Sequence, residues 1–134
     1  MTSAETAYLD TSAVVKLLTR EAETTALRRR LRTLPRRASA TLLRVELLRT
    51  VSRLGLPRLM GEARRQLEQI HLIRIDDDLL DRAAHLDSPS MRSLDAIHLA
   101  AALSLGADLA AVITYDERLR AAANALGLPV LAPR

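Results

Sequence analysis

The segment TAYLDTSAVVKLL, from Thr6 to Leu18, decides the fold that this sequence predicts. Its first part, TAYLD, is a short apolar run typical of a buried strand, and a helical pattern over Ser12 to Leu18 follows almost at once. Asp10 stands at the junction, where it closes the apolar run. A strand that leads directly into a helix is the repeating step of an α/β fold.

The same alternation of short apolar strands and helices continues along the rest of the chain. The pattern predicts helices at Thr24–Leu34, which Pro35 stops, and at Thr41–Leu54, Leu59–Gln69, Asp78–Leu86, Ser93 or Asp95 to about Gly106, and Asp116–Leu126. Between them it predicts an extended segment at Arg37–Ala40 and strands at His71–Ile75, Ala110–Thr114 and Pro129–Ala132. Ser39 or Thr41 is the expected cap of the helix that begins at Thr41. Such alternation favours one doubly wound α/β/α domain over residues 1–134, with a parallel sheet covered on both faces.

Length and composition limit the class of protein. A chain of 134 residues with an apolar fraction of 49% suits one domain with one core. The absence of cysteine excludes disulfides and thiolate metal sites. The sequence shows no secretory signal and no apolar run long enough to span a membrane, so we expect a cytoplasmic protein.

Arginine dominates the basic residues. Lys16 is the only lysine, and six of the nineteen arginines lie between Arg28 and Arg37. Guanidinium groups suit phosphate oxygens, so these arginines fit a polyanionic partner, but they equally fit a solvated helix face. Tyr8 and Tyr115 are the only aromatic residues apart from histidine, too few to build a platform on which bases could stack. This scarcity argues against a module that only binds nucleic acid.

Acidic residues interrupt or bound four apolar segments: Asp10, Glu46, Asp95 and Asp116. Asp10 and Asp116 close predicted strands, and ligands of open α/β sheets bind beyond the carboxyl ends of the strands. Both residues could equally be helix caps. Glu46 lies at the edge of the buried stripe of its helix, where the alternative is an ion pair with Arg49 or Arg53.

Asp95 is the acid that a structural role explains least well. Its helix, LDAIHLAAALSL, is apolar almost all round, and Asp95 shares a stripe with Leu99 and Ala102. The alternative role is stabilisation of the amino end of the helix. His98, on a neighbouring stripe, is interpreted as a core or rim histidine with satisfied hydrogen bonds. The run Asp76 to Asp78 follows a strand and precedes a helix, so capping explains it.

A cluster of ionised carboxylates has to take up protons or bind a cation. With neither cysteine nor a pair of histidines at ligand spacing, oxygen ligands favour Mg²⁺ or Mn²⁺ over Zn²⁺. Such an ion can activate a water and stabilise the leaving oxygen of a phosphodiester. Thr11, Ser12 and Thr114 are the hydroxyls expected to orient the carboxylates.

Four blocks of this chain, YLDTSAVVKLL, VELLRTV, LDAIHLAAAL and ITYDERL, resemble the PIN-domain ribonucleases, and most closely the VapC-type toxins of bacterial type II toxin–antitoxin systems. The resemblance runs from about Tyr8 to Pro133 with the blocks in the family's order. It implies five parallel strands between helices, and a Mg²⁺- or Mn²⁺-dependent endoribonuclease in which Asp10, Glu46, Asp95 and Asp116 are the catalytic and metal-binding acids. Thr114 matches the hydroxyl position before the last acid, whereas Glu117 has no secure counterpart.

The resemblance also implies partners: an RNA substrate, a cognate antitoxin protein, and a second copy of the chain in a homodimer. Two other classes of function remain. One is a non-catalytic PIN-like module that binds RNA or protein, against which the intact set of acids argues. The other is a phosphoryl-accepting domain, which would need a late lysine, whereas Lys16 lies near the start.

Overall fold

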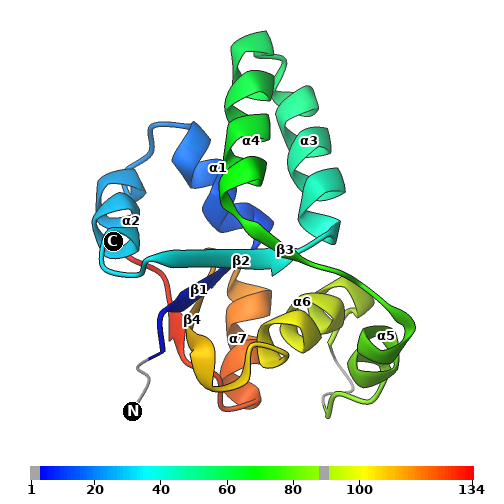
Figure 1. Ribbon diagram of the computed structural model, residues 1–134. Coiled ribbons are helices and arrows are strands. Elements are labelled where there is room, and N and C mark those ends of the chain that lie inside the picture. The colour runs from blue at the N-terminus through cyan, green and yellow to red at the C-terminus, as the bar shows by residue number, and fades with distance from the viewer. Residues whose placement is uncertain (1–3, 88–90) are drawn as a thin grey trace.

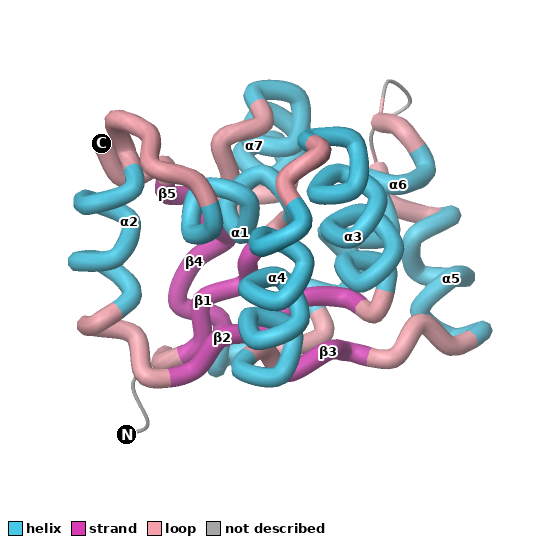
Figure 2. The backbone as a smooth tube through the Cα atoms, turned by 90° about the horizontal axis from the view of Figure 1, so that it is seen from above, coloured by secondary structure: helices cyan, strands magenta, loops and turns pink. Residues whose placement is uncertain are grey.

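A five-stranded parallel sheet with helices on both faces forms the molecule (Figure 1). The structure is a computed structural model that describes residues 4–87 and 91–134. The strands are β1 (Thr6–Leu9), β2 (Arg36–Ala40), β3 (His71–Ile73), β4 (Leu109–Ile113) and β5 (Val130–Leu131). Their order in the sheet is β3-β2-β1-β4-β5, so β3 and β5 are the edge strands (Figure 2). The predicted doubly wound fold is confirmed.

The helices divide into two layers (Figure 1). They are α1 (Thr11–Leu18), α2 (Thr24–Leu31), α3 (Leu42–Leu54), α4 (Pro57–Gln69), α5 (Asp77–Ala84), α6 (Ser93–Leu103) and α7 (Glu117–Ala125), with a 3₁₀ turn at Gly106–Asp108. The first four helices pack on one face of the sheet, and the last three cover the other. No helix in the described part of the chain is long and apolar enough to cross a membrane.

Side chains of β1 point alternately to the two faces of the sheet, which explains why both helical layers pack against it. Ala7 and Leu9 are fully buried against the α1–α4 layer, whereas Tyr8, between them, is fully buried against α5 and α6. A strand buried on both faces is mostly apolar, and β1 follows this rule after Thr6, its first residue. Burial of a side chain the size of Leu9 contributes about 1.5–3 kcal/mol to the free energy of unfolding.

The ends of several elements differ from the prediction. The helix α2 ends at Leu31, not Leu34, because Thr33 and Leu34 donate to the carbonyls of Arg30 and Leu31 in tighter turns before Pro35. The strand β3 ends at Ile73, two residues early. The helix α4 begins two residues early, at Pro57, because proline suits the first turn of a helix.

The predicted cap at the start of α3 is wrong. Thr41 occupies the cap position, but its backbone is already helical, with φ −57° and ψ −23°, and its side chain makes no capping hydrogen bond. A capping side chain normally needs an extended backbone to reach the free N–H groups of the first turn. Ser39 lies inside β2 and is fully buried, so it does not cap the helix either.

Strand register brings Asp10 and Thr114 together. Leu9 of β1 pairs with Ile113 of β4, so the next residue of each strand emerges at the same carboxyl edge. The sheet order places β2 on one side of β1 and β4 on the other, which is the point where ligands of doubly wound sheets bind. At the other, amino end of these strands, Arg36 pairs with Glu5 and Asp108.

Candidate active site

Asp10 is a buried carboxylate held by three hydrogen bonds. Its Oδ1 accepts from Ser12 Oγ at 2.7 Å and from the backbone N–H of Ala13 at 3.0 Å, and its Oδ2 accepts from Thr114 Oγ1 at 2.7 Å. The residue is 5% exposed. Asp10 therefore caps α1, as the structural alternative held, and also presents a charge at the carboxyl edge of the sheet.

Burial sets the protonation of this group. Desolvation raises the pKa of Asp10, and the hydrogen bonds from Thr114, Ser12 and Ala13 only partly offset that effect. An ionised carboxylate at this position is thus destabilised relative to one in water. A bound cation would relieve that cost.

Thr114 links Asp10 to Asp116. The Thr114 side chain is fully buried at the end of β4, and its Oγ1 accepts from the backbone N–H of Asp116 at 3.0 Å while donating to Asp10. Asp116 caps α7 through Oδ1, which accepts from the backbone N–H groups of Arg118 and Leu119 at 2.9 and 3.4 Å. The side chain of Asp116 is exposed, unlike that of Asp10.

Glu46 lies on α3, in the other helical layer from His98 of α6, and the two side chains meet. His98 Nε2 contacts Glu46 Oε1 at 2.7 Å, and Thr11 Oγ1 donates to the same oxygen at 2.9 Å. The expected alternative, an ion pair with Arg49 or Arg53, does not form among the described residues. Burial acts to raise the pKa of Glu46, but the hydrogen bonds and charge of His98, with Thr11, outweigh it and lower that pKa.

His98 is a buried histidine whose two ring nitrogens both have partners. Its Nδ1 contacts the hydroxyl of Tyr8 at 2.7 Å, and its Nε2 contacts Glu46. The geometry matches the predicted core or rim histidine with satisfied hydrogen bonds, but the partner Glu46 was not predicted. The signal was present, because a histidine in a helix otherwise made of apolar residues has to find polar partners from other elements.

Asp95 is the third residue of α6 and is half-buried. Its Oδ2 is buried and has no hydrogen-bond partner among the described residues. Burial and then the charge of Asp116 raise the pKa of Asp95, with a smaller contribution from Glu46. Mutual repulsion of this kind requires that these carboxylates lie near one another. Asp95 therefore interacts with the other acids through charge repulsion and not through hydrogen bonds.

The fit to a metal ion rests on the unpaired Oδ2 of Asp95. Among residues 4–87 and 91–134, no group of three or more His, Asp and Glu side chains is arranged to hold a metal ion. Mg²⁺ commonly keeps several waters and binds one or two carboxylates together with substrate phosphate. The buried free oxygen of Asp95 and its repulsion with Asp116 fit that kind of partial site.

Other acids and bases singled out in the sequence take structural positions. Asp76 caps α5 by accepting from the backbone N–H of Leu79 at 2.8 Å, as predicted. Glu117 has a side chain 71% exposed and pairs with Arg120 and Arg134. In the Arg28–Arg37 cluster, Arg28 donates to the carbonyl of Leu17, at the end of α1, at 2.7 Å.

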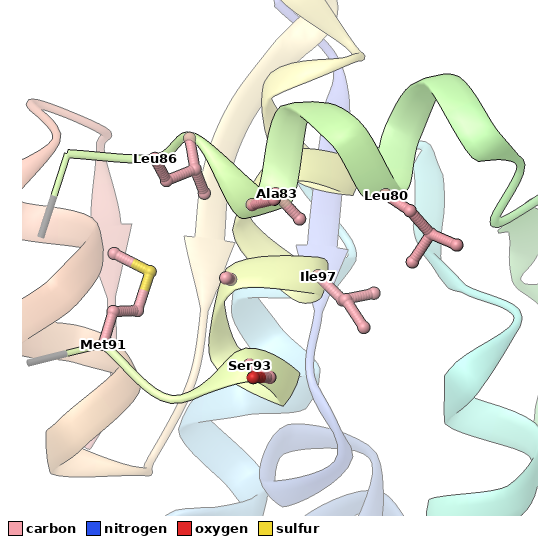
Figure 3. A pocket seen from close by; sticks show the side chains of 8 residues that line it. Leu80, Ala83, Leu86, Met91, Ser93 and Ile97 are labelled. Atoms are coloured by element: carbon pink, nitrogen blue, oxygen red, sulfur yellow. The ribbon is translucent and has the colours of Figure 1, made fainter. Parts of the chain in front are cut away.

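A separate apolar pocket lies away from this chemistry. It measures about 270 Å³ and lies between α5 and α6, where its lining contains no acidic residue. Figure 3 shows Leu80 and Ala83 of α5 on one side, and Ser93 and Ile97 of α6 on the other. The helix α6 thus has two different faces, one toward this pocket and one carrying Asp95 and His98 toward the acids.

Comparison with known proteins places these features in a family. A family model described as the PIN domain matches residues 7–125. Ribonuclease VapC46 of Mycobacterium tuberculosis is 48% identical over 126 residues, which are 94% of this chain and 96% of that protein. Ribonuclease VapC35 of the same organism is 44% identical over 133 residues, with the same coverage of 94% and 96%.

Solved structures agree on the fold. The crystal structure of VapC20 of M. tuberculosis, a sarcin–ricin loop cleaving toxin, matches with a TM-score of 0.69 at 18% identity, over 87% of this chain and 94% of that one. A toxin–antitoxin complex from Klebsiella pneumoniae matches with a TM-score of 0.72 at 23% identity, over 96% and 98% of the two chains. At such identities the likeness shows a shared fold.

Proposed function

This chain belongs to the PIN domain family, among its VapC-type endoribonucleases, and on that premise we propose that it is the toxin of a toxin–antitoxin pair and cleaves RNA with Mg²⁺ or Mn²⁺. One observation carries the metal-dependent part of this proposal. Asp95 has a buried oxygen without a hydrogen-bond partner among the described residues, and the negative charge of Asp116 repels the carboxylate of Asp95. A divalent cation relieves both the repulsion and the unsatisfied oxygen.

The acids Asp10, Glu46, Asp95 and Asp116 are the residues proposed to hold the ion, directly or through its waters. When bound, the ion would act as a Lewis acid that polarises the scissile phosphate and lowers the pKa of a water. The hydroxyls of Ser12 and Thr114 hold Asp10 in one orientation, and Thr11 does the same for Glu46. A carboxylate of the set that is not committed to a cap could accept the proton released as water attacks phosphorus, while the bond from phosphorus to the leaving ribose oxygen breaks.

The proposal includes partners of three kinds. The RNA backbone is drawn to a chain with a formal net charge of +4 whose basic residues are almost all arginine. An antitoxin protein is the second partner, by analogy with the Klebsiella pneumoniae complex. A second copy of the chain, in a homodimer, is the third.

A non-catalytic binding module is the alternative, and one observation favours it. The described residues contain no ready-made group of three metal ligands. A module of this kind would bind RNA or protein without binding Mn²⁺. Calorimetric titration of the purified chain with Mn²⁺ separates the two, because an absence of heat at millimolar Mn²⁺ would favour the module.

The direct test is loss of RNA cleavage on single carboxylate replacements. Asp95→Asn and Asp10→Asn keep side-chain size and remove one charge, so we expect each to lower the cleavage rate by at least about 100-fold. Glu68→Gln is the matched control, because Glu68 is exposed on α4 and belongs to no contact of the site. Wild-type cleavage rates in either Asp variant, with Mg²⁺ present, would show that the assigned site is wrong.

A further inference from the structure

Tyr8 and His98 form a buried polar pair beneath Glu46, and the proposed reaction does not use them. Tyr8 is 0% exposed on β1, and His98 is 4% exposed on α6. The Tyr8 hydroxyl lies 2.7 Å from His98 Nδ1, and the two rings meet edge to face at 5.9 Å and 77°. Burial of two polar groups costs free energy that an apolar pair of the same size would not cost, which suggests a role for them beyond filling space.

Elementary chemistry sets the direction of this hydrogen-bond chain. The phenol of a buried tyrosine keeps its proton, so Tyr8 can donate to Nδ1. In the tautomer whose Nδ1 accepts from Tyr8, the imidazole carries its proton on Nε2. His98 Nε2 then donates to Glu46 Oε1, 2.7 Å away. The chain of hydrogen bonds in this tautomer runs from Tyr8 through His98 to Glu46 Oε1.

Both donors to Glu46 converge on the same oxygen. Thr11 from α1 and His98 from α6 contact Oε1, at 2.9 and 2.7 Å. No hydrogen bond from the described residues reaches Oε2. One carboxylate oxygen is thus anchored by elements of both helical layers, and the other is left for a ligand.

We propose that Tyr8 and His98 are positioning residues, which hold Glu46 through Oε1 so that Oε2 is presented to a divalent cation or its waters. This inference rests on the proposed metal-dependent function. Tyr8 sets which ring nitrogen of His98 carries the proton, and His98 sets the orientation of the Glu46 carboxylate. The arrangement parallels the way outer groups orient the ligands of metal sites in general.

The first test reads the proton position directly, in metal-free wild-type protein. Nitrogen-15 NMR of the His98 ring distinguishes a protonated from an unprotonated nitrogen. We expect the proton on Nε2, and we expect Tyr8→Phe to shift the Nδ1 resonance, because its hydrogen bond is lost. An unprotonated Nε2 in the wild-type chain would overturn the proposal, since His98 could then not donate to Glu46.

The second test measures Mn²⁺ affinity by calorimetry, without RNA. Loss of an outer hydrogen bond commonly weakens metal binding roughly 10- to 100-fold, so we expect His98→Leu to raise the Mn²⁺ Kd by about 10-fold or more. Tyr8→Phe should raise it less, because Nε2 can still donate. His98→Gln, which restores an N–H donor, should recover part of the loss. In cleavage assays the same variants should lower kcat and leave KM almost unchanged.

Thr24→Val is the control for a purely structural effect. Thr24 is a buried hydroxyl that donates to the carbonyls of Lys16 and Thr19, remote from the acids, so its loss costs stability but should not change the Mn²⁺ Kd. If Tyr8→Phe and His98→Leu behave like Thr24→Val, the positioning role is wrong while the proposed function stands. A wild-type chain that binds no Mn²⁺ would instead overturn the proposed function, and this role with it.

Discussion

Asp10 combines two roles that sequence reasoning treats as alternatives. Its Oδ1 caps α1, and its Oδ2 is held by Thr114 from a strand 104 residues away. A cap can therefore also be a member of the proposed site when the turn that it caps lies at the carboxyl end of a central strand. The same holds for Asp116 at the start of α7.

The raised pKa of Asp10 gives a prediction for pH dependence. Because burial raises this pKa in the folded state, the folded chain binds the proton more tightly than the unfolded chain does. The stability contributed by the protonated form is lost as pH rises through that pKa. In EDTA we therefore expect Asp10→Asn to melt above the wild type at pH 8, with a gap that narrows toward pH 4.

Thermal denaturation of both proteins across this pH range checks the sign. Other titrating groups are common to the two chains, so the difference between the two melting temperatures isolates Asp10. An Asp10→Asn chain that melts below the wild type at pH 8 would show that the three hydrogen bonds outweigh the cost of the buried charge.

The sequence allowed some contacts of the acids to be predicted and others not. Thr11, Ser12 and Thr114 could be named as hydroxyls near acids, because they neighbour acids in the sequence or close a strand. The contact between His98 and Glu46 could not, because it joins residues 52 apart whose helices belong to opposite layers. Helical spacing tells which face a side chain occupies, but not what lies against that face.

At the scale of elements, two glycines show how much depends on backbone conformation. Gly55 ends α3 in the left-handed region, with φ +67°, whereas Gly61 lies in the middle of α4 with ordinary helical geometry. A Cβ added at Gly55 would meet nothing within 4 Å, and one at Gly61 would meet only Arg65 Nη1 at 3.9 Å. The space for a Cβ is thus similar at the two positions, and the backbone conformation decides how alanine affects the stability.

We expect opposite effects of alanine at the two positions. Gly55→Ala should lower the free energy of unfolding by about 1 kcal/mol, because a left-handed backbone strains any residue with a Cβ. Gly61→Ala should raise it by up to about 1 kcal/mol, because alanine is the better helix former. Urea denaturation of both variants checks this. Equal signs for the two changes would contradict the explanation.

The types of elements were predictable, and their ends were less so. Apolar runs and helical patterns located every strand and α-helix that the structure describes, because burial on two faces leaves a strong pattern, but they missed the 3₁₀ turn at Gly106–Asp108. The errors at α2, α3 and β3 occur where one or two local hydrogen bonds decide the end. Such bonds depend on the tertiary surroundings of the turn, which periodicity does not encode.

At the scale of the whole molecule, the acids come from both layers and from the sheet edge. Asp10 follows β1, Asp116 follows β4, Glu46 lies on α3 and Asp95 on α6. Strand order could be anticipated as doubly wound, which placed Asp10 and Asp116 at one edge. The approach of α3 and α6 over that edge depends on packing between layers, which the sequence does not reveal.

A cation shared by these elements should stabilise the whole fold. We expect the melting temperature to rise with Mn²⁺ concentration, and binding at 100 times the Kd contributes about 2.7 kcal/mol. EDTA should reverse the rise. Asp95→Asn should abolish most of it, whereas Glu68→Gln should not. A concentration-dependent rise that is unchanged in Asp95→Asn would place the bound Mn²⁺ elsewhere in the chain.

The order of the four acids along the chain has a consequence for biosynthesis. A protein emerges from the ribosome with its amino end first, and Asp116 is the last of the acids to appear. Until β4 has followed, Asp10 lacks the Thr114 hydroxyl, and the central strand lacks one of its two neighbours. A growing chain therefore lacks a complete set of these acids until the segment that carries Asp116 has also been made.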